Sequence, residues 1–261
     1  MHPVLIQYGV FKLPTYGVFV ALGYLAGILW LQSRRQEMGL DETKFWRLIY
    51  VLFFGAIAGG KLMYWAVSYR EIVSGRLSLF GDLRYGFVFF GGVLGAAALA
   101  WVAKWWLGFE FLSLADYFSA VLPLGHAVGR LGCLAAGCCY GRPTTLPWGV
   151  VLGGDPASST PLELWGVPLH PTQIYESLAN LLIWLFLAFA LLPKVTSRRL
   201  RAGTVFFSYA ILYGSARFVI EFFRYDDRGA SLYPFSISQW ISLAAIFLAA
   251  GLLMKRGVKA R

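Results

Sequence analysis

The sequence has few charged residues and no long polar segment. Only 14% of its 261 residues are charged and 58% are apolar, whereas about 25% of the residues in typical soluble domains are charged. The mean hydropathy is +0.63. This composition excludes a water-soluble globular protein. Because no hydrophilic block is long enough to form a separate soluble domain, we expect residues 1–261 to form a single integral membrane domain.

Acidic residues are also scarce. The sequence has 13 Asp and Glu against 23 Lys and Arg, which gives a formal net charge of +10. Such an excess can indicate nucleic-acid binding, but here the basic residues lie in short connections beside apolar segments rather than along one face. We therefore interpret them as topology determinants that face anionic lipid, and we expect no nucleic-acid partner.

Long apolar stretches dominate what remains. Seven of them approach the roughly twenty residues that a helix needs to cross a bilayer. The first lacks a basic start and a small-residue cleavage site, so we expect it to stay as a spanning helix. The sequence predicts an all-α polytopic membrane protein with about seven transmembrane helices, at approximately Tyr16–Leu31, Phe45–Val67, Gly86–Leu107, Leu114–Ala136, Ile174–Leu192, Ala202–Phe223 and Ser238–Met254.

Lys and Arg are unevenly divided between alternate connections. One side has twelve: Arg34, Arg35, Lys44, Lys104, Lys194, Arg198, Arg199, Arg201, Lys255, Arg256, Lys259 and Arg261. The other side has seven: Lys12, Arg70, Arg76, Arg84, Arg142, Arg224 and Arg228. Positively charged loops stay in the cytoplasm, so we predict an external amino terminus and a cytoplasmic carboxy terminus. The proline-rich connection 137–173 is then external, as an ordered or lid-like loop.

Two charged residues lie inside one of the apolar stretches. Arg217 and Glu221 are four residues apart between Leu212 and Phe223, which places them on the same helix face. A charge in the middle of a bilayer costs roughly 2.5–3.5 kcal/mol on insertion scales, so such groups usually line a wet cavity or bind a charged ligand. Arg130 is a second buried cation. Two arginines in one cavity would form a receptor for an anion.

The segment from Gly125 to Arg142 contains five glycines in eighteen residues. Each glycine lowers helix stability by up to about 1 kcal/mol, so backbones or a ligand must come close there. One interpretation is tight helix packing. The other is a helix that breaks at the membrane face and presents backbone N–H groups beside guanidinium groups, an arrangement that suits a phosphate.

This segment resembles the signature of the prolipoprotein diacylglyceryl transferases, matching it at Gly129, Arg130, Gly132, Gly137 and Gly141. The resemblance covers nearly the whole chain, because further matches follow in order. They are Tyr16-Gly17, Gly59-Gly60-Lys61, Gly91-Gly92, the run from His170 to Glu176, Tyr213-Gly214, Arg217, Glu221 to Arg224, and Ser238-Gln239.

The resemblance implies an activity. Enzymes of this family transfer the diacylglyceryl group of phosphatidylglycerol to the thiol of a lipobox cysteine in a secreted prolipoprotein, and glycerol phosphate leaves. The expected partners are that lipid and that peptide, and no metal or cofactor is required. The implied location is the bacterial cytoplasmic (inner) membrane, with a site that opens toward the outer leaflet.

The resemblance also implies roles for particular residues. Arg130 and Arg217 would bind the negative charge that builds on the departing phosphate, while Glu221 would hold Arg217 in position or accept a proton. Lys61 would either contact the headgroup or pair with a carboxylate. The other expected substrate-binding residues are Tyr16, Gly132, Gly137, Gly141, Arg142, His170, Gln173, Tyr175, Tyr213 and Arg224.

The chain departs from the family pattern at a candidate base. Many members have a His before the paired glycines of the third span, where this chain has Phe90. His126, four residues before Arg130, is either a substitute for that base or an ordinary interior histidine.

Cysteines replace two further signature residues. Cys133 stands in place of an Asn and Cys138 in place of a Glu, with Cys139 adjacent. The alternatives are tight packing of small residues, a disulfide from Cys133 to Cys138 or Cys139, and a reactive thiolate that takes part in catalysis. Zinc bound with His126 is a fourth alternative, but the spacing is not that of a standard finger.

Five other acidic or basic positions have less specific interpretations. We interpret Asp116 as structural and Glu176 as a helix-start carboxylate that faces the positive end of the helix dipole. Asp226, Asp227 and Arg228 form either a solvated turn or a recognition site for the incoming peptide. Two alternative functions also remain: a family paralogue that uses a different acceptor, and a non-enzymatic transporter of lipid or anions.

Overall fold

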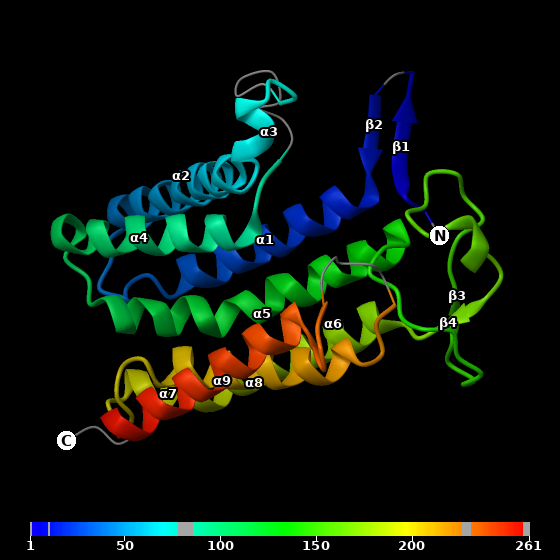
Figure 1. Ribbon diagram of the computed structural model, residues 1–261. Helices are drawn as coiled ribbons and strands as arrows, with labels where there is room; N and C mark the ends of the chain where they lie inside the picture. Colours follow the sequence, from blue (N-terminus) through cyan, green and yellow to red (C-terminus); the bar gives the residue numbers. More distant parts are fainter. Residues whose placement is uncertain (1, 10, 78–85, 226–230, 258–261) are drawn as a thin grey trace. The chain divides into compact units, whose positions relative to one another are not determined.

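The computed structural model describes residues 2–9, 11–77, 86–225 and 231–257 (Figure 1). About 67% of the chain is helical. The chain forms two compact units, one of residues 1–31 and 115–261 and the other of residues 32–114. The single-domain expectation stays a prediction. Several residues discussed above lie outside the described residues: Arg84, Asp226, Asp227, Arg228, Lys259 and Arg261.

The unit of residues 32–114 is built on two long helices, α2 (Glu42–Val67) and α4 (Phe89–Leu107), with the short helix α3 (Tyr69–Val73) between them in sequence. Asp41 caps α2, since its carboxylate accepts a hydrogen bond from the Lys44 backbone N–H at 2.8 Å. Figure 1 shows α2 and α4 side by side.

Glycines allow α2 and α4 to approach closely. A Cβ added to Gly59 would lie 2.3 Å from the carbonyl oxygen of Gly91, and one added to Gly95 would lie 2.3 Å from that of Gly55. No side chain fits at these distances, so the backbones themselves form the contact. This is the small-residue packing by which membrane helices associate, because lipid gives them no hydrophobic reason to pair.

The other unit contains most of the remaining helices. Its helices α8 (Thr204–Glu221) and α9 (Ile237–Arg256) lie side by side (Figure 1). A Cβ on Gly23, in the first helix of this unit, would lie 2.8 Å from the carbonyl oxygen of Gly125. Its helices are α1 (Thr15–Ser33), α5 (Phe111–Ala136), α6 (Thr172–Leu185), a π-helical turn (Phe186–Leu191), α7 (Leu192–Thr196), α8 (Thr204–Glu221) and α9 (Ile237–Arg256). Helix α1 belongs to this unit as far as Leu31, and α5 belongs to it from Ala115 onward.

The predicted helices are confirmed at the coarse level. Six described helical segments are long and apolar enough to cross a membrane. The predicted stretch Ala202–Phe223 is also helical, as α8, but α8 is not one of these six, because it carries Arg217 and Glu221 among small and polar residues. The count of seven spans therefore stays a prediction. The six are Thr15–Ser33, Glu42–Val67, Phe90–Leu107, Phe111–Ala136, Thr172–Thr196 and Ile237–Arg256.

Short antiparallel strand pairs, which the sequence did not lead us to expect, lie outside the helices. β1 (Val4–Tyr8) pairs with β2 (Phe11–Pro14), and β5 (Ser231–Leu232) pairs with β6 (Phe235–Ser236). Each pair is adjacent to the start of a long helix. The turn at β6 continues directly into α9, which Ser236 caps by accepting a hydrogen bond from the Gln239 N–H.

The connection 137–173 is ordered around a small apolar core. Its strands β3 (Val150–Val151) and β4 (Pro168–Leu169) pair, and Thr160 ties the loop to the end of α5 by donating a hydrogen bond to the Gly137 carbonyl at 2.8 Å. The ordered part of the prediction is thus confirmed. The core of the loop consists of Tyr140, Leu152, Leu164 and Leu169, with Leu134, Val150 and Val167 packed against it.

Asp116 is structural, as predicted. It is fully buried, and its carboxylate accepts hydrogen bonds from the backbone N–H groups of Gly203 at 2.6 Å and Phe206 at 2.9 Å. These donors belong to the first turn of α8, which has no helical acceptors for them. Asp116 therefore fixes the start of α8 against α5.

Candidate active site

Glu176 lies at the centre of a buried group of charges. It projects from the first turns of α6 and is 1% exposed. One carboxylate oxygen lies 2.7 Å from Arg130 Nη2 of α5. The other lies 3.5 Å from Nη1 of Arg224, which follows α8. A single carboxylate thus joins two cations that come from different parts of the sequence.

Arg217 and Glu221 form the expected pair on α8. Their side chains meet at 2.6 Å, and Glu221 also accepts a hydrogen bond from Ser236 Oγ at 2.9 Å. Arg217 Nη2 donates to Ser238 Oγ at 3.5 Å. Its other terminal nitrogen, Nη1, is buried and has no hydrogen-bond acceptor among the described residues. That donor is available for a ligand, and leaving it unsatisfied would cost about 1–3 kcal/mol or more.

The two groups are joined into one row. Glu221 lies 4.0 Å from Arg224 Nε, so the order is Arg130, Glu176, Arg224, Glu221 and Arg217. Within the part of the chain that the structure describes, three guanidinium groups of the row alternate with two carboxylates, which leaves one positive charge in excess among these five residues. Buried charges are tolerated when they are paired, and an unbalanced one requires a counter-ion. The row is therefore the candidate site for an anion.

Helix α5 ends at Gly137. Its φ of +72° is the left-handed conformation that glycine adopts without strain. The Gly137 N–H bonds the Leu134 carbonyl at 3.2 Å and the Cys138 N–H bonds the Cys133 carbonyl at 3.1 Å, which together make a Schellman motif. This gives Gly137 a structural role and confirms that the helix breaks where the signature places its glycine.

The break brings the three cysteines together. The sulfur atoms of Cys133, Cys138 and Cys139 all lie within 4.8 Å of one another, and in the described structure none of the three forms a disulfide. Hydrogen bonds from the Cys133 and Cys138 thiols lower the pKa of Cys139 below its usual value, and Arg224 lowers it further. Contacts of the Cys138 thiol with Cys133 and then with Cys139 raise the pKa of Cys138 above its usual value.

The buried start of α6 holds this cysteine turn in place. Thr172 Oγ1 donates to the Cys139 carbonyl at 2.7 Å, and Gln173 Nε2 donates to the Cys138 carbonyl at 2.8 Å. Both side chains are fully buried. Gln173 Oε1 has no hydrogen-bond partner among the described residues. Gln173 therefore positions the turn with one end of its amide and keeps an acceptor at the other.

Gly141 and Arg142 connect this turn to the end of α8. A Cβ on Gly141 would lie 2.6 Å from the His170 carbonyl oxygen and 2.7 Å from that of Phe223, so only glycine fits. The Arg142 N–H bonds the Phe223 carbonyl at 2.8 Å, and its Nε donates to the Arg224 carbonyl at 3.3 Å. Arg142 thereby fixes the backbone that presents Arg224 to Glu176.

His170 and Tyr175 lie in an aromatic group beside this contact. The hydroxyl of Tyr175 accepts a hydrogen bond from Trp148 Nε1 at 2.8 Å and lies 3.2 Å from His170 Nδ1. Both rings pack edge-on against Phe223, at centroid distances of 5.2 and 6.1 Å. The structure thus gathers these two predicted residues near Arg224 without placing either against Arg130 or Arg217.

Comparisons with known proteins identify the family of this chain. The family model of the prolipoprotein diacylglyceryl transferases matches residues 3–255. The chain belongs to this family. A phosphatidylglycerol–prolipoprotein diacylglyceryl transferase of Clostridium tetani is 35% identical over 248 residues, covering 95% of each chain.

Two other relatives lead to the same assignment. Transferase 2 of Clostridium perfringens is 32% identical, with 93% of this chain and 90% of the relative covered. That of Geobacter sulfurreducens is 32% identical, with 95% and 92% covered. The family assignment and the six apolar helices identify the chain as a multi-pass bacterial membrane protein.

His126 is a close neighbour of the anion site in this family member. Its Nε2 accepts a hydrogen bond from Arg130 Nε at 3.1 Å and lies 3.5 Å from Glu176. The ring also packs on Tyr213 at 5.4 Å, and Tyr213 stacks on Tyr209. Because Arg130 occupies the basic nitrogen, His126 orients the guanidinium in this arrangement.

Three further predicted residues have other surroundings. A Cβ on Gly132 would lie 2.9 Å from Phe19 Cβ and 3.2 Å from Tyr16 Cα, so Gly132 lets α1 and α5 pack. Tyr16 itself is exposed. Lys61 belongs to the unit of residues 32–114, where it is buried with its ammonium over the rings of Tyr64 and Phe87 at 5.1 and 5.3 Å.

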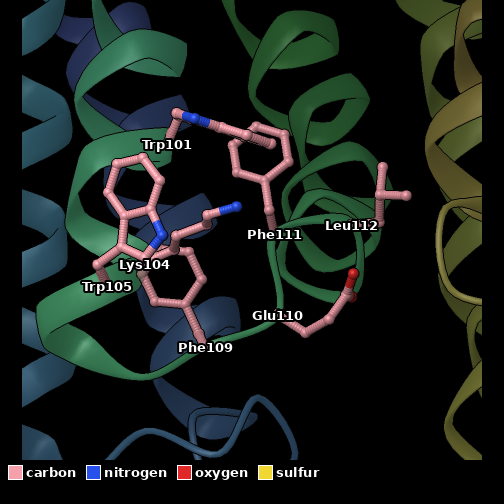
Figure 2. Close-up of a pocket in the computed structure, with 7 residues that line it drawn as sticks. All are labelled: Trp101, Lys104, Trp105, Phe109, Glu110, Phe111 and Leu112. Carbon is pink, nitrogen blue, oxygen red and sulfur yellow. The ribbon is translucent and has the colours of Figure 1, made fainter.

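A cavity of about 520 Å³ lies elsewhere, in the unit of residues 32–114 (Figure 2). Its cation is Lys104, whose ammonium lies 3.5 Å from the ring centre of Trp101 and 5.1 Å from that of Trp105. Figure 2 shows these rings around the lysine, with Glu110 at the edge. The aromatic faces satisfy this charge, so the cavity lacks the excess cation of the arginine row.

Sequence reasoning missed the importance of Glu176. We interpreted it as a helix-start carboxylate, but it is the residue that links Arg130 to Arg224. One signal was available: Glu176 lies near the start of an apolar helix, and the next polar residues of that helix, Ser177 and Asn180, recur at helical spacing. That pattern marks a polar face directed inward.

Proposed function

We propose that this protein transfers the diacylglyceryl group of phosphatidylglycerol to the cysteine thiol of a prolipoprotein lipobox, with release of glycerol phosphate. The relatives are named for this reaction. The observation that carries the proposal is the row from Arg130 to Arg217. Counted over the residues that the structure describes, the row has one excess positive charge, and the buried Nη1 of Arg217 has no acceptor.

The row suits the chemistry of this transfer. The donor phosphodiester carries one negative charge, and a second develops on the leaving phosphate as the bond from the glyceryl carbon to oxygen breaks. Arg130 and Arg217 hold the phosphate, and their attraction grows with that charge, so they stabilise the transition state more than the bound lipid. Glu176 and Glu221 keep the guanidinium groups in place before the lipid arrives.

Other residues position the substrate. Gln173 offers its unpartnered carbonyl oxygen to a headgroup hydroxyl, while Arg142, Gly141 and Gly137 set the backbone around Arg224. The aromatic group of His170 and Tyr175 lies at the edge of the site toward the loop 137–173, which we propose closes over the headgroup. Tyr16, Gly132 and Tyr213 shape the surrounding helix packing and the lipid-facing surface. That Lys61 contacts the headgroup or pairs with a carboxylate stays a prediction.

The orientation follows from the distribution of basic residues. We place the protein in the cytoplasmic (inner) membrane with seven spans, counting α8, as one membrane domain. The amino terminus is external and the carboxy terminus is cytoplasmic. The site then opens toward the outer leaflet, where the lipobox of a secreted precursor arrives.

A paralogue with a different acceptor is the second candidate. The observation that favours it is the group of three thiols beside Arg130, since Cys133 Sγ lies 3.9 Å from Arg130 Nη1. A chain thiol at that position is itself a potential alkyl acceptor.

A transfer assay separates the candidates. Purified protein is incubated in micelles with phosphatidylglycerol that carries one label on the acyl chains and another on the glycerol headgroup, together with a lipobox peptide. The proposal expects acyl label on the peptide and release of labelled glycerol phosphate in equal amounts.

Other outcomes point elsewhere. Headgroup release with acyl label on the protein, or on no peptide, indicates the paralogue. Lipid movement between vesicles without headgroup release indicates a transporter, and the proposed reaction is then wrong. A peptide with Ser in place of the lipobox Cys is the control for acceptor chemistry.

A further inference from the structure

The three cysteines have the geometry of a metal site. Three sulfur atoms bound to one zinc ion at about 2.3 Å would lie about 3.8–4.0 Å apart. The sulfur atoms of Cys133, Cys138 and Cys139 already lie within 4.8 Å of one another. The sulfur atoms would have to approach one another by about 1 Å or less to reach these distances, which side-chain rotation can provide. A disulfide would use only two of the three and would break up this group.

The backbone that carries the cysteines is held rigidly. Cys139 has a φ of +63°, which is uncommon and costly for a residue with a side chain and persists only where the surroundings enforce it. Here Thr172 and Gln173, both fully buried, bind the carbonyl groups of Cys139 and Cys138. Strain enforced by buried partners at a cluster of ligand atoms is typical of a functional site rather than of packing.

The charges around the cluster suit bound thiolates. Arg130 Nη1 lies 3.9 Å from Cys133 Sγ. A guanidinium this close favours thiolate over neutral thiol ligands at the cluster, because an opposite charge stabilises the ionised form. Donors that contact the ligand sulfurs orient them and tune the metal, as outer partners do in known sites.

The cluster provides three ligands and leaves one position open. Among the described residues no fourth His, Cys, Asp or Glu joins the group. Structural zinc sites are closed by four protein ligands, whereas catalytic ones keep a position for water or substrate. Thiol ligands favour zinc or another soft ion over magnesium or calcium.

From this geometry we infer that Cys133, Cys138 and Cys139 bind one zinc ion whose fourth position takes the thiolate of the acceptor cysteine. The inference rests on the proposed function, and it goes beyond the resemblance, which implied no metal. It assigns a role to the thiols that replace the Asn and Glu of the family signature.

The step is balanced as follows. The acceptor thiol binds zinc and loses its proton to water, because a coordinated thiol is deprotonated. The sulfur electron pair then forms a bond to the glyceryl carbon of the donor. The bond from that carbon to the phosphate oxygen breaks, its electrons stay on oxygen, and glycerol phosphate leaves beside Arg130. The thioether product is neutral and binds zinc weakly, so it departs.

Cobalt serves as a coloured probe for this site. The reduced, metal-free full-length protein in detergent is titrated with Co²⁺, and thiolate-to-cobalt charge-transfer absorption is recorded. We expect one equivalent to bind and one equivalent of Zn²⁺ to displace it. Cys133→Ser and Cys138→Ser should lose the band, while Ala135→Ser on the same segment, which also introduces a hydroxyl, should keep it. Absence of a thiolate band in the reduced wild-type protein would overturn the inference.

The open position is tested with the acceptor. A lipobox peptide should intensify the band as a fourth sulfur joins, and the same peptide with Ser for Cys should not. Removal of zinc should slow transfer about tenfold, because a free cysteine is only a few per cent ionised at neutral pH. An unchanged spectrum, or equal rates with and without zinc, would refute the acceptor role. Metal and peptide binding without any transfer would support the site and refute the proposed function instead.

Discussion

The two units of this protein use the same membrane setting for different purposes. In the unit of residues 32–114, α2 and α4 meet through backbone atoms at Gly55, Gly59, Gly91 and Gly95. In the other unit, helices and turns meet through the charges from Arg130 to Arg217. At the glycine contact, backbone atoms of the two helices touch directly, so these residues leave no space for a ligand. The charged contact has one cation in excess among its described residues, and on that excess we base the proposed anion site.

Among the changes that test this comparison, removal of Arg130 from the charged contact should have the largest effect. Arg130→Ala deletes one of the two guanidinium groups that we propose bind the developing phosphate charge, and we expect kcat to fall about 10²–10³-fold, as when an oxyanion donor is removed. The dual-label transfer assay measures it. Arg130→Lys keeps the positive charge but loses the two-pronged hydrogen bonding of the guanidinium, so its rate should lie between those of the wild type and Arg130→Ala. Arg199→Ala, at an exposed position, is the matched control and should match the wild type.

Glu176→Gln tests whether the carboxylate holds the row together. The amide keeps the shape but leaves Arg130 and Arg224 without their shared counter-charge. Breaking such a buried pair costs about 3–5 kcal/mol, so we expect a lower unfolding midpoint in detergent. Added phosphatidylglycerol should restore part of that midpoint, because its phosphate supplies the lost negative charge. If the midpoint does not change, Glu176 is not the link that we describe.

Gly59→Ala tests the glycine contact of the other unit. The added methyl group would press against the Gly91 carbonyl oxygen at 2.3 Å, and overpacking of this kind typically costs about 1–3 kcal/mol. Thermal unfolding in detergent should show the loss. The KM for phosphatidylglycerol should stay the same in the folded fraction. A changed KM with unchanged stability would contradict a purely structural contact.

Gly129→Ala should have the smallest effect, and in the opposite direction. Although Gly129 belongs to the signature, a Cβ there meets no atom within 4 Å. Alanine should stabilise α5 by up to about 1 kcal/mol. Gly132→Ala, one turn away and 2.9 Å from Phe19 Cβ, is the matched comparison and should destabilise. Unfolding midpoints of the two variants should therefore move apart, and equal shifts would contradict the packing described for α1 and α5.

The sequence predicted those features that depend on local pattern. Apolar length located the helices, and the spacing of Arg217 and Glu221 predicted their ion pair. The link through Glu176 could not be predicted from local pattern, because Glu176 lies 46 residues from Arg130 and 48 residues from Arg224 along the sequence. The cysteine cluster is intermediate. Its residues are near in sequence, but only the turn at Gly137 and the hydrogen bonds from α6 decide that the three sulfurs meet.

The most direct test of the central claim is a double-variant cycle on the transfer rate, with wild type, Arg130→Lys, Arg217→Lys and the double variant. If both guanidinium groups grip one phosphate within one row, their effects on kcat should be coupled by about 0.5–3 kcal/mol, as for residues of a shared network. We predict that the fold-loss in kcat of the double variant differs measurably from the product of the fold-losses of the two single variants. Losses that simply multiply would mean that the two arginines act independently, which would contradict a shared anion site.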